Sequence, residues 1–249
     1  MQRLSATLLL LAAVSVARAA APDPLHGSSQ CLVVVTDSWT ASSGRMFEFE
    51  RKGDAPWKIR GAAVQVVTGK SGLAWGRGLV SAGDVPAPTK VEGDNKAPAG
   101  IFRLRSTFGY ASQSPGTRMP YLALSQNIVA VDDPASRYYN QLIDQRTVAR
   151  RDWHSAEHMI LRDDRYKWGI VVAHNLPPQP GAGSCIFLHV WKTPNTTTTG
   201  CTATAEATVL DIIRWLDPAR RPLLVQLPLS IYNERQAAWA LPSLPQSGH

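Results

Sequence analysis

The chain contains little cysteine and no long apolar segment. Three of its 249 residues are cysteine, too few for a small fold held together by disulfides. Beyond the N-terminus, no segment approaches the roughly 18 apolar residues that a membrane-spanning helix requires, so we expect no transmembrane helix. Basic residues outnumber acidic ones by 26 to 19, but they are scattered and form no stripe for nucleic acid. The 44% apolar content instead predicts a folded domain with a substantial core.

The N-terminal residues have the composition of a targeting segment. One positive charge, Arg3, precedes an apolar run over residues 6–16, and the small residues Ala17 and Ala19 follow it. This order predicts a secretory signal peptide over residues 1–21, and therefore a secreted protein. For the remainder we expect a linker at 22–30, a folded domain at 31–228 and a polar, loosely packed C-terminal tail at 229–249.

Short segments rich in apolar and β-branched residues recur along the domain and predict strands. They lie at residues 31–36, 45–51, 62–68, 101–105, 121–125, 128–131, 168–174, 185–190 and 223–227. One amphipathic helix is expected to begin near Ala203 and to end at Leu216, and an irregular helix is expected around 155–161. Residues 69–100 are rich in glycine and proline and predict a loop region. The pattern favours a mainly β fold with a few helices (α+β).

Cysteine and histidine chemistry is expected near residue 200. Cys201 follows Gly200 and directly precedes the expected helix, where unpaired backbone N–H groups would lower the pKa of a thiol. His189 ends an apolar segment, and a loop of this length can return the chain so that its imidazole meets the sulfur. We therefore expect Cys201 as nucleophile, His189 as general base, and the N–H groups of Gly200, Cys201 and Thr202 as oxyanion donors. The alternative is a buried structural cysteine beside an unrelated histidine.

A series of motifs follows one order from about residue 64 to residue 227. They are Lys96-Ala97-Pro98-Ala99-Gly100-Ile101-Phe102, Phe108-Gly109-Tyr110-Ala111, Val131-Asp132-Asp133-Pro134-Ala135-Ser136, Tyr139-Asn140, Asp152-Trp153, Ser155-Ala156-Glu157, Met159, His174-Asn175, Ile186-Phe187-Leu188-His189 and Thr199-Gly200-Cys201-Thr202-Ala203. This ordered set resembles the YkuD-type L,D-transpeptidase catalytic domain, in particular a divergent bacterial branch of that family. Thr199 stands where the family commonly has a second histidine, and Val190 stands where a glycine usually follows the first.

The resemblance implies a β-sandwich or barrel-like L,D-transpeptidase catalytic fold and a cysteine acyltransferase of the bacterial cell wall. Cys201 would attack the carbonyl that follows an L-centre in a peptidoglycan stem peptide, and His189 would act first as base and then as acid. The acyl group would pass to an amine or to water, and no cofactor would be needed. The implied partners are peptidoglycan stem peptides, and the implied compartment is the periplasm.

Further polar residues near these motifs are candidates for binding or orienting the stem peptide: His174, Asn175, Thr199, Tyr139, Asn140, Asp133 and Glu157. Several of them have an equally good reading as strand-end or turn residues. Cys31 and Cys185 fall on expected strands, and in an oxidising compartment they could form a disulfide or remain two buried thiols.

Three alternative functions are open at this point. On the same scaffold, water could take the acyl group, as in an L,D-carboxypeptidase or an amidase, or the domain could be a non-catalytic cell-wall-binding module. The segment His154-Ser155-Ala156-Glu157-His158 also matches the inverted zinc-protease pattern H-x-x-E-H. On a helix, His154 and His158 would share one face and hold zinc, with Glu157 as base. No third ligand is indicated downstream, so we expect no metal.

Overall fold

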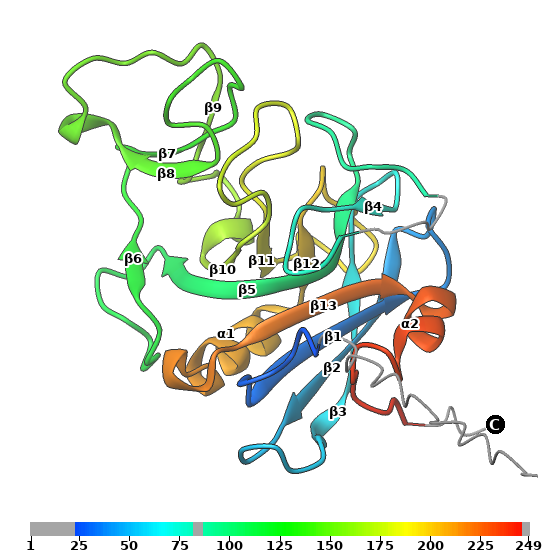
Figure 1. The fold of residues 1–249 in the computed structure, drawn as a ribbon. Coiled ribbons are helices and arrows are strands. Elements are labelled where there is room, and N and C mark those ends of the chain that lie inside the picture. The colour runs from blue at the N-terminus through cyan, green and yellow to red at the C-terminus, as the bar shows by residue number, and fades with distance from the viewer. Residues whose placement is uncertain (1–22, 82–86, 246–249) are drawn as a thin grey trace, which may run out of the picture.

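The computed structural model describes residues 23–81 and 87–245, and the expected signal peptide at residues 1–21 lies outside them. Within this part of the chain the fold is mainly β, with only two α-helices, α1 (Glu206–Trp215) and α2 (Leu229–Arg235) (Figure 1). The expected β-rich α+β class is confirmed. No helix among the described residues is long and apolar enough to cross a membrane.

One large sheet forms the body of the molecule. It runs in the order β10–β11–β12–β3–β2–β1–β13–β5–β4, β6 pairs with β5, and a further pairing of β10 with β5 closes the sheet on itself. The sheet is therefore barrel-like. Its strands are β1 (Gln30–Thr36), β2 (Ser43–Glu50), β3 (Lys58–Val67), β4 (Leu73–Trp75), β5 (Ala97–Gly109), β6 (Tyr121–Ala123), β10 (Trp168–Val172), β11 (Phe187–Val190), β12 (Thr202–Thr204) and β13 (Leu223–Pro228).

Strand β1 lies in the middle of this sheet, and both of its faces are buried. It is antiparallel to β2 and parallel to β13. Leu32 and Val34 pack into one cluster with the apolar face of α1, whereas Cys31, Val33 and Val35 pack into the cluster on the opposite face. Side chains alternate along a strand, so a strand buried on both faces requires a continuous apolar run.

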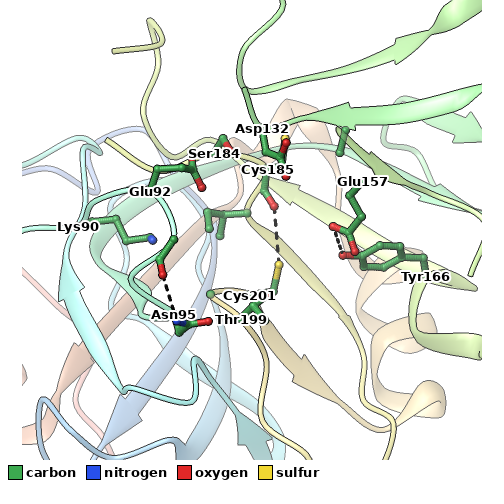
Figure 2. Close-up of a pocket in the computed structure, with 14 residues that line it drawn as sticks. Lys90, Glu92, Asn95, Asp132, Glu157, Tyr166, Ser184, Cys185, Thr199 and Cys201 are labelled. Atoms are coloured by element: carbon green, nitrogen blue, oxygen red, sulfur yellow. Dashed lines mark hydrogen bonds between the residues drawn. The ribbon is translucent and has the colours of Figure 1, made fainter. Parts of the chain in front are cut away.

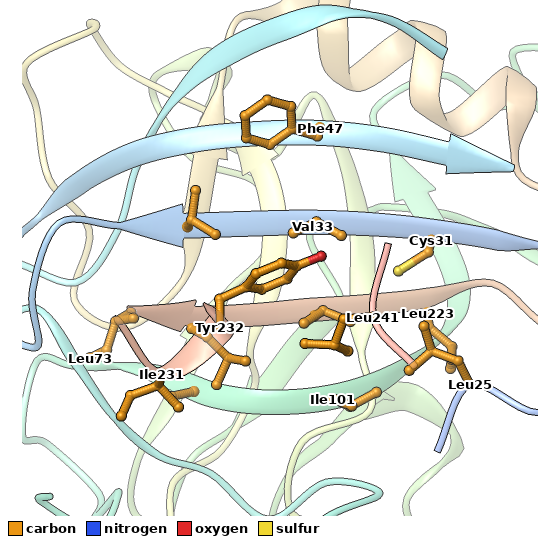
Figure 3. Packing of buried hydrophobic residues seen from close by; sticks show 14 of the residues in the cluster. Leu25, Cys31, Val33, Phe47, Leu73, Ile101, Leu223, Ile231, Tyr232 and Leu241 are labelled. Carbon is orange, nitrogen blue, oxygen red and sulfur yellow. The ribbon is translucent and has the colours of Figure 1, made fainter. Parts of the chain in front are cut away.

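The chain after β13 covers one face of the sheet (Figure 3). Ile231 and Tyr232 of α2, and Leu241 beyond it, are buried in the cluster on that face, and the Tyr232 hydroxyl donates to the Pro242 carbonyl at 2.7 Å. The expectation of a loosely packed tail at 229–249 is therefore wrong for its described part. Six apolar residues of this segment pack in the cluster, although polar residues lie between them: Leu229, Ile231, Tyr232, Trp239, Leu241 and Leu244.

The segment before β1 is packed as well. Leu25 is fully buried. The Gln30 side chain donates to the Trp215 carbonyl at 2.7 Å and accepts from the Asp217 N–H at 2.8 Å. The described part of the expected linker at 22–30 thus belongs to the domain, because its polar groups satisfy backbone groups rather than water.

A separate three-stranded sheet lies beside the large one, at the top of Figure 1. It consists of β8 (Gln141–Asp144), β7 (Ile128–Val131) and β9 (Ala156–His158). The helix expected around 155–161 is wrong, because this segment pairs with β7 as the antiparallel strand β9. Three short 3-10 helices complete the described elements: η1 (Gln145–Thr147), η2 (Asp164–Tyr166) and η3 (Pro218–Arg220).

The remaining strand predictions agree with the structure in position, although their bounds differ. Each expected strand overlaps an observed one, and β10 and β11 pair as antiparallel neighbours, with Gly169 opposite His189. The expected loop at 69–100 contains the short strand β4, which pairs in parallel with the beginning of β5.

Candidate functional site

Cys201 lies in the connection between two parallel strands, not at the start of a helix. It directly precedes β12, and β12 runs parallel to β11 with Ala203 beside His189. The helix α1 begins only at Glu206, so its N-terminal N–H groups are not next to the sulfur. The expected helix start near Ala203 is wrong because residues 202–204 take part in the sheet.

A cavity of about 210 Å³ opens at Cys201 (Figure 2). Ala130 of β7 and Glu157 of β9 line it from the small sheet, and Ile186 and Cys201 line it directly before β11 and β12 of the large sheet. The other lining residues are Lys90, Glu92, Gly93, Asn95, Asp132, Tyr166, Ser184, Cys185, Thr199 and Gly200.

The thiol of Cys201 is surrounded by protein groups. The Phe187 N–H donates to its Sγ at 3.3 Å, and Sγ lies 3.7 Å from the Cys185 carbonyl, which it can serve as a donor. Burial raises the pKa of Cys201 to about 12, and the Phe187 N–H opposes this rise only in part. The expectation of a lowered thiol pKa is therefore wrong, since the helix that was to stabilise the thiolate is absent from this position.

His189 shares a second, smaller cavity with the sulfur. This cavity, of about 30 Å³, is lined by His189, Cys201, Thr199, Glu157 and Tyr166, among others. His189 Nδ1 lies 2.8 Å from the Val190 carbonyl, which can only accept, so Nδ1 carries a proton, and the backbone of Arg165 also bonds to the ring. Burial lowers the pKa of His189 to about 4. Among the described residues no hydrogen bond joins the imidazole to the thiol.

Glu157 and Thr199, two of the expected site residues, line both cavities that meet at Cys201. The Glu157 carboxylate accepts from the Tyr166 hydroxyl at 2.9 Å. Burial raises the pKa of Glu157, although the Tyr166 hydroxyl opposes this rise. Tyr166, whose ring also packs edge-on against His189 at 5.2 Å between centroids, was not foreseen.

The three backbone N–H groups expected as oxyanion donors are not equivalent. The Gly200 N–H donates to Thr198 Oγ1 at 3.2 Å, and Thr202 is part of β12, opposite Leu188. The N–H of Cys201 itself is left as the principal candidate. Thr198 Oγ1 also donates to the Cys201 carbonyl at 2.6 Å, and this bond stabilises the turn that carries Cys201.

His174, Asn175 and Asn140 serve the framework around the site. Both ring nitrogens of His174 are engaged: Nδ1 accepts from the Arg77 N–H at 3.3 Å, and Nε2 donates to the Ala182 carbonyl at 3.0 Å. Asn175 bonds to the carbonyls of the loop that follows it. Asn140 donates to the carbonyls of His174 and Asn175 and accepts from the Cys185 N–H at 2.8 Å. None of the three lines the cavities at Cys201.

Tyr139 and Asp133 also make contacts within the protein. The Tyr139 hydroxyl donates to Glu92, which lines the larger cavity. Asp133 accepts from the backbone N–H groups of Ala135 and His154, at 2.9 and 2.7 Å, and these bonds lower the pKa of its carboxyl. Asp133 is therefore a turn residue, whereas Tyr139 orients a cavity residue.

The expected disulfide between Cys31 and Cys185 is not formed. All three cysteines are free thiols. Cys31 is enclosed in the core beside α2, whereas Cys185 lines the cavity and packs with Phe187 and Cys201, so the sheet keeps the first two in different clusters.

The zinc site considered for His154, Glu157 and His158 requires a helix, and the structure has none there. Residues 156–158 form a strand, the His154 side chain is 93% exposed and pairs with Asp133, and Glu157 points to Tyr166. Within 23–81 and 87–245, no group of three or more His, Cys, Asp or Glu residues could hold a metal.

The structure adds polar groups that sequence reasoning did not select. Lys90, Glu92, Asp132 and Ser184 line the larger cavity together with Cys185. Asp132 lies in the same sequence motif as Asp133, which was the expected site residue. Comparison with models of known families and with curated proteins finds no match to this chain.

Proposed function

We propose that the protein is an L,D-transpeptidase-like cysteine acyltransferase that acts on peptidoglycan stem peptides in the periplasm. The observation that carries this proposal is that Cys201 and His189 line one cavity, with His189 on β11 and Cys201 directly before the neighbouring parallel strand β12. The ordered motifs in the sequence supply the family and hence the substrate class. The β-rich, barrel-like sheet is compatible with the fold that they imply.

The chemistry starts from a neutral pair. Because burial raises the pKa of the thiol and lowers that of the imidazole, the proton moves from Sγ to His189 Nε2 as the sulfur attacks the peptide carbonyl. The oxyanion of the tetrahedral intermediate is bound by the Cys201 N–H. The carbon–nitrogen bond breaks, the leaving amine takes the proton from His189, and a thioester on Cys201 remains.

The Val190 carbonyl supports the base in this scheme. It accepts the Nδ1–H of His189, so it fixes the tautomer and stabilises the imidazolium that forms during attack. An acceptor amine then attacks the thioester and restores the free thiol. If water attacks instead, the same intermediate leads to the hydrolase.

One observation favours a second candidate, a non-catalytic cell-wall-binding module. The thiol is deeply buried, its pKa is raised, and its polar contacts among the described residues are with the Phe187 N–H and the Cys185 carbonyl rather than with His189. Such a sulfur is typical of structural cysteines.

Mass spectrometry of the protein after incubation with a tetrapeptide muropeptide separates the two candidates. We expect an acyl adduct on Cys201 that is absent from Cys201→Ala and retained in Cys31→Ala, a control in the distant core. Cross-linked products indicate transfer, and trimmed products indicate hydrolysis. If the folded protein forms no adduct but still binds the muropeptide, the enzyme proposal is wrong and the binding module is supported.

A further inference from the structure

A cavity of about 630 Å³ lies apart from the cavities at Cys201. It is lined by the end of β2, the turn into β3, Ser29 ahead of β1 and Arg220 of η3. The turn between β2 and β3 lies at the bottom of Figure 1. Strand β3 begins at this cavity, whereas its last residue, Val67, pairs with β12 beside the candidate site. The two places are therefore at opposite ends of β3, and they share no lining residue.

Positive charge gathers around this cavity. Four of its lining residues are basic, Arg51, Lys52, Lys58 and Arg220, and Glu50 is the only acidic one. Arg220 Nη1 lies 3.0 Å from the Glu50 carboxylate, so these two charges neutralise each other. The other three cations have no carboxylate partner within 4.0 Å in the described part of the chain. The cavity therefore has three positive charges that the protein does not compensate.

The guanidinium group of Arg51 is held in one position. Its Nε donates to the Ser28 carbonyl at 2.8 Å, its Nη2 donates to the Leu25 carbonyl at 2.7 Å, and it packs over the Trp57 ring at 4.3 Å from the ring centroid. Its Nη1 makes no hydrogen bond with the described residues. A cation that is already ordered loses little conformational entropy when it binds a ligand, and a guanidinium matches the oxygens of an oxyanion.

Hydrogen bonds of Arg220 join the walls of the cavity. Its Nη2 donates to the carbonyls of Ser29 and Arg51, at 2.9 and 3.3 Å, and its own carbonyl accepts from the Ser29 N–H at 2.8 Å. The segment before β1, the turn after β2 and η3 are thereby tied together. The cavity is consequently formed before any ligand arrives, and only the exposed side chains of Lys52 and Lys58 have to become ordered around it.

The size of the cavity and its apolar lining indicate more than an inorganic ion. Its volume is within the range of roughly 300–1,000 Å³ that is usual for sites of small organic molecules. Ala55 and Pro56 add apolar surface beside the basic side chains. These features fit an anionic group that is attached to an organic group.

We infer that this cavity binds the phosphoryl group of a phosphate monoester, with Arg51, Lys52 and Lys58 as its cationic contacts. A monoester carries about −1.5 to −2 charge at pH 7 and offers three strong acceptor oxygens, which suits three uncompensated cations better than a single carboxylate does. The same group occurs in soluble esters and in the headgroup of phosphatidic acid. Because the site shares no residue with the cavities at Cys201, the inference does not depend on the proposed function.

NMR titration of the folded protein with glycerol 3-phosphate tests the site. Glycerate, which has a carboxylate in place of the phosphoryl group, and glycerol are the ligand controls. We expect the phosphate ester to bind most tightly and its affinity to fall as salt is added. Lys52→Gln and Lys58→Gln should each weaken it by about threefold, and the double variant by about tenfold. Lys70→Gln removes the same charge at an exposed position outside the cavity and should leave the affinity unchanged.

Sedimentation with lipid vesicles distinguishes the two sources of the ester. Vesicles of phosphatidylcholine with phosphatidic acid are compared with vesicles of phosphatidylcholine alone. Binding to the phosphatidic acid vesicles that is lost in the Lys52→Gln/Lys58→Gln protein, but not in Lys70→Gln, assigns the site to a lipid headgroup. Binding of glycerol 3-phosphate without binding to these vesicles assigns it to a soluble ester.

The site is overturned if neither form of the ester binds, if glycerate binds as tightly as the ester, or if Lys70→Gln weakens binding as much as the double variant does. Both cavity lysines are exposed, so their variants are expected to fold. Cys201→Ala should retain full affinity for glycerol 3-phosphate. Loss of binding in that variant would place the ester at Cys201 and also overturn the inference, whereas the presence or absence of an acyl adduct on Cys201 does not affect it.

Discussion

At the scale of single residues, burial governs the protonation of both Cys201 and His189, the two residues that we propose to react. A charged thiolate and a charged imidazolium are each penalised where water is excluded, so Cys201 and His189 both favour their neutral forms. An ion pair at rest is therefore not the expected state. In the proposed mechanism, activation comes with the substrate, whose carbonyl accepts the electrons of the sulfur while Nε2 accepts its proton.

Because the Cys201 thiol is neutral at rest, we expect it to react slowly with iodoacetamide. Because burial raises its thiol pKa to about 12, the rate at pH 7 should be at least about a hundredfold below that of an unperturbed cysteine, and it should still be rising above pH 9. Peptide mapping by mass spectrometry after timed alkylation gives the rate for each cysteine separately.

The same protein in denaturant is the reference for that measurement, since its three cysteines should then titrate near the free-cysteine value of roughly 8.5. A midpoint below pH 8 for Cys201 in the folded protein would show that an ion pair with His189 outweighs burial. The Phe187 N–H would then be only one of several groups that stabilise the thiolate.

At the scale of elements, Asn140 joins three segments that frame the cavity. Its side-chain amide donates to the carbonyls of His174 and Asn175, which follow β10, and accepts from the Cys185 N–H, which precedes β11. Its φ of 65° lies in the left-handed region, which asparagine tolerates better than most residues. We expect Asn140→Ala to lower the free energy of unfolding by about 2–4 kcal/mol, because buried backbone groups lose their partners.

Urea unfolding measures this loss, and two variants show its origin. Asn140→Gly tolerates the left-handed backbone conformation but cannot form the side-chain hydrogen bonds, so this variant should remain less stable than the wild type. Asn195→Ala, at an exposed loop position, should have little effect on stability. Wild-type stability in Asn140→Gly would mean that the side-chain bonds contribute nothing and that only the backbone conformation matters.

Elements with a local signal were predictable from the sequence, and elements set by distant pairing were not. The apolar run of β1 is sufficient to identify a strand buried on both faces. By contrast, Thr202 and Thr204 could serve as helix caps, but their hydroxyls bond to Gln226 and to the Gln65 carbonyl of β3, and the segment joins the sheet as β12. Tertiary pairing overrides local propensity there.

The site itself could be predicted in part. The identity of Cys201 and His189 follows from residue types and order, and their shared cavity follows from the parallel pairing of β11 with β12. Glu157 was among the expected site residues, but Asp132, which also lines the cavity, was not. It follows β7 of the small sheet, whose position over Cys201 depends on contacts far apart in the chain.

At the scale of the whole molecule, two buried histidines link stability to pH. Burial lowers the pKa of both His174 and His189 to about 4, whereas an unfolded histidine titrates near 6.5. The unfolded state therefore binds more protons between these values, so stability is fully present above roughly pH 6.5 and is lost as pH falls toward 4. Each histidine contributes up to about 3 kcal/mol to this loss.

Glu157 acts in the opposite direction over part of this range. Its pKa is raised by burial, so its proton is held more tightly in the folded state, and protonation below its folded pKa offsets some of the loss. The carboxyls of Asp133 and Asp144, whose pKa values are lowered, contribute only below their ordinary range and do not affect the comparison.

Urea unfolding at pH 7, 5.5 and 4.5 tests this linkage. We expect the free energy of unfolding to fall steeply from pH 6.5 downward, and His174→Gln to remove about half of the slope even if the variant is less stable at pH 7. His26→Gln, at an exposed position, should leave the slope unchanged. A profile that stays flat between pH 7 and 4.5, and that neither His174→Gln nor His189→Gln changes, would mean that both imidazoles take up protons in the folded state. Water or a counter-charge would then lie beside His189, and the basis for a neutral pair of Cys201 and His189 would be lost.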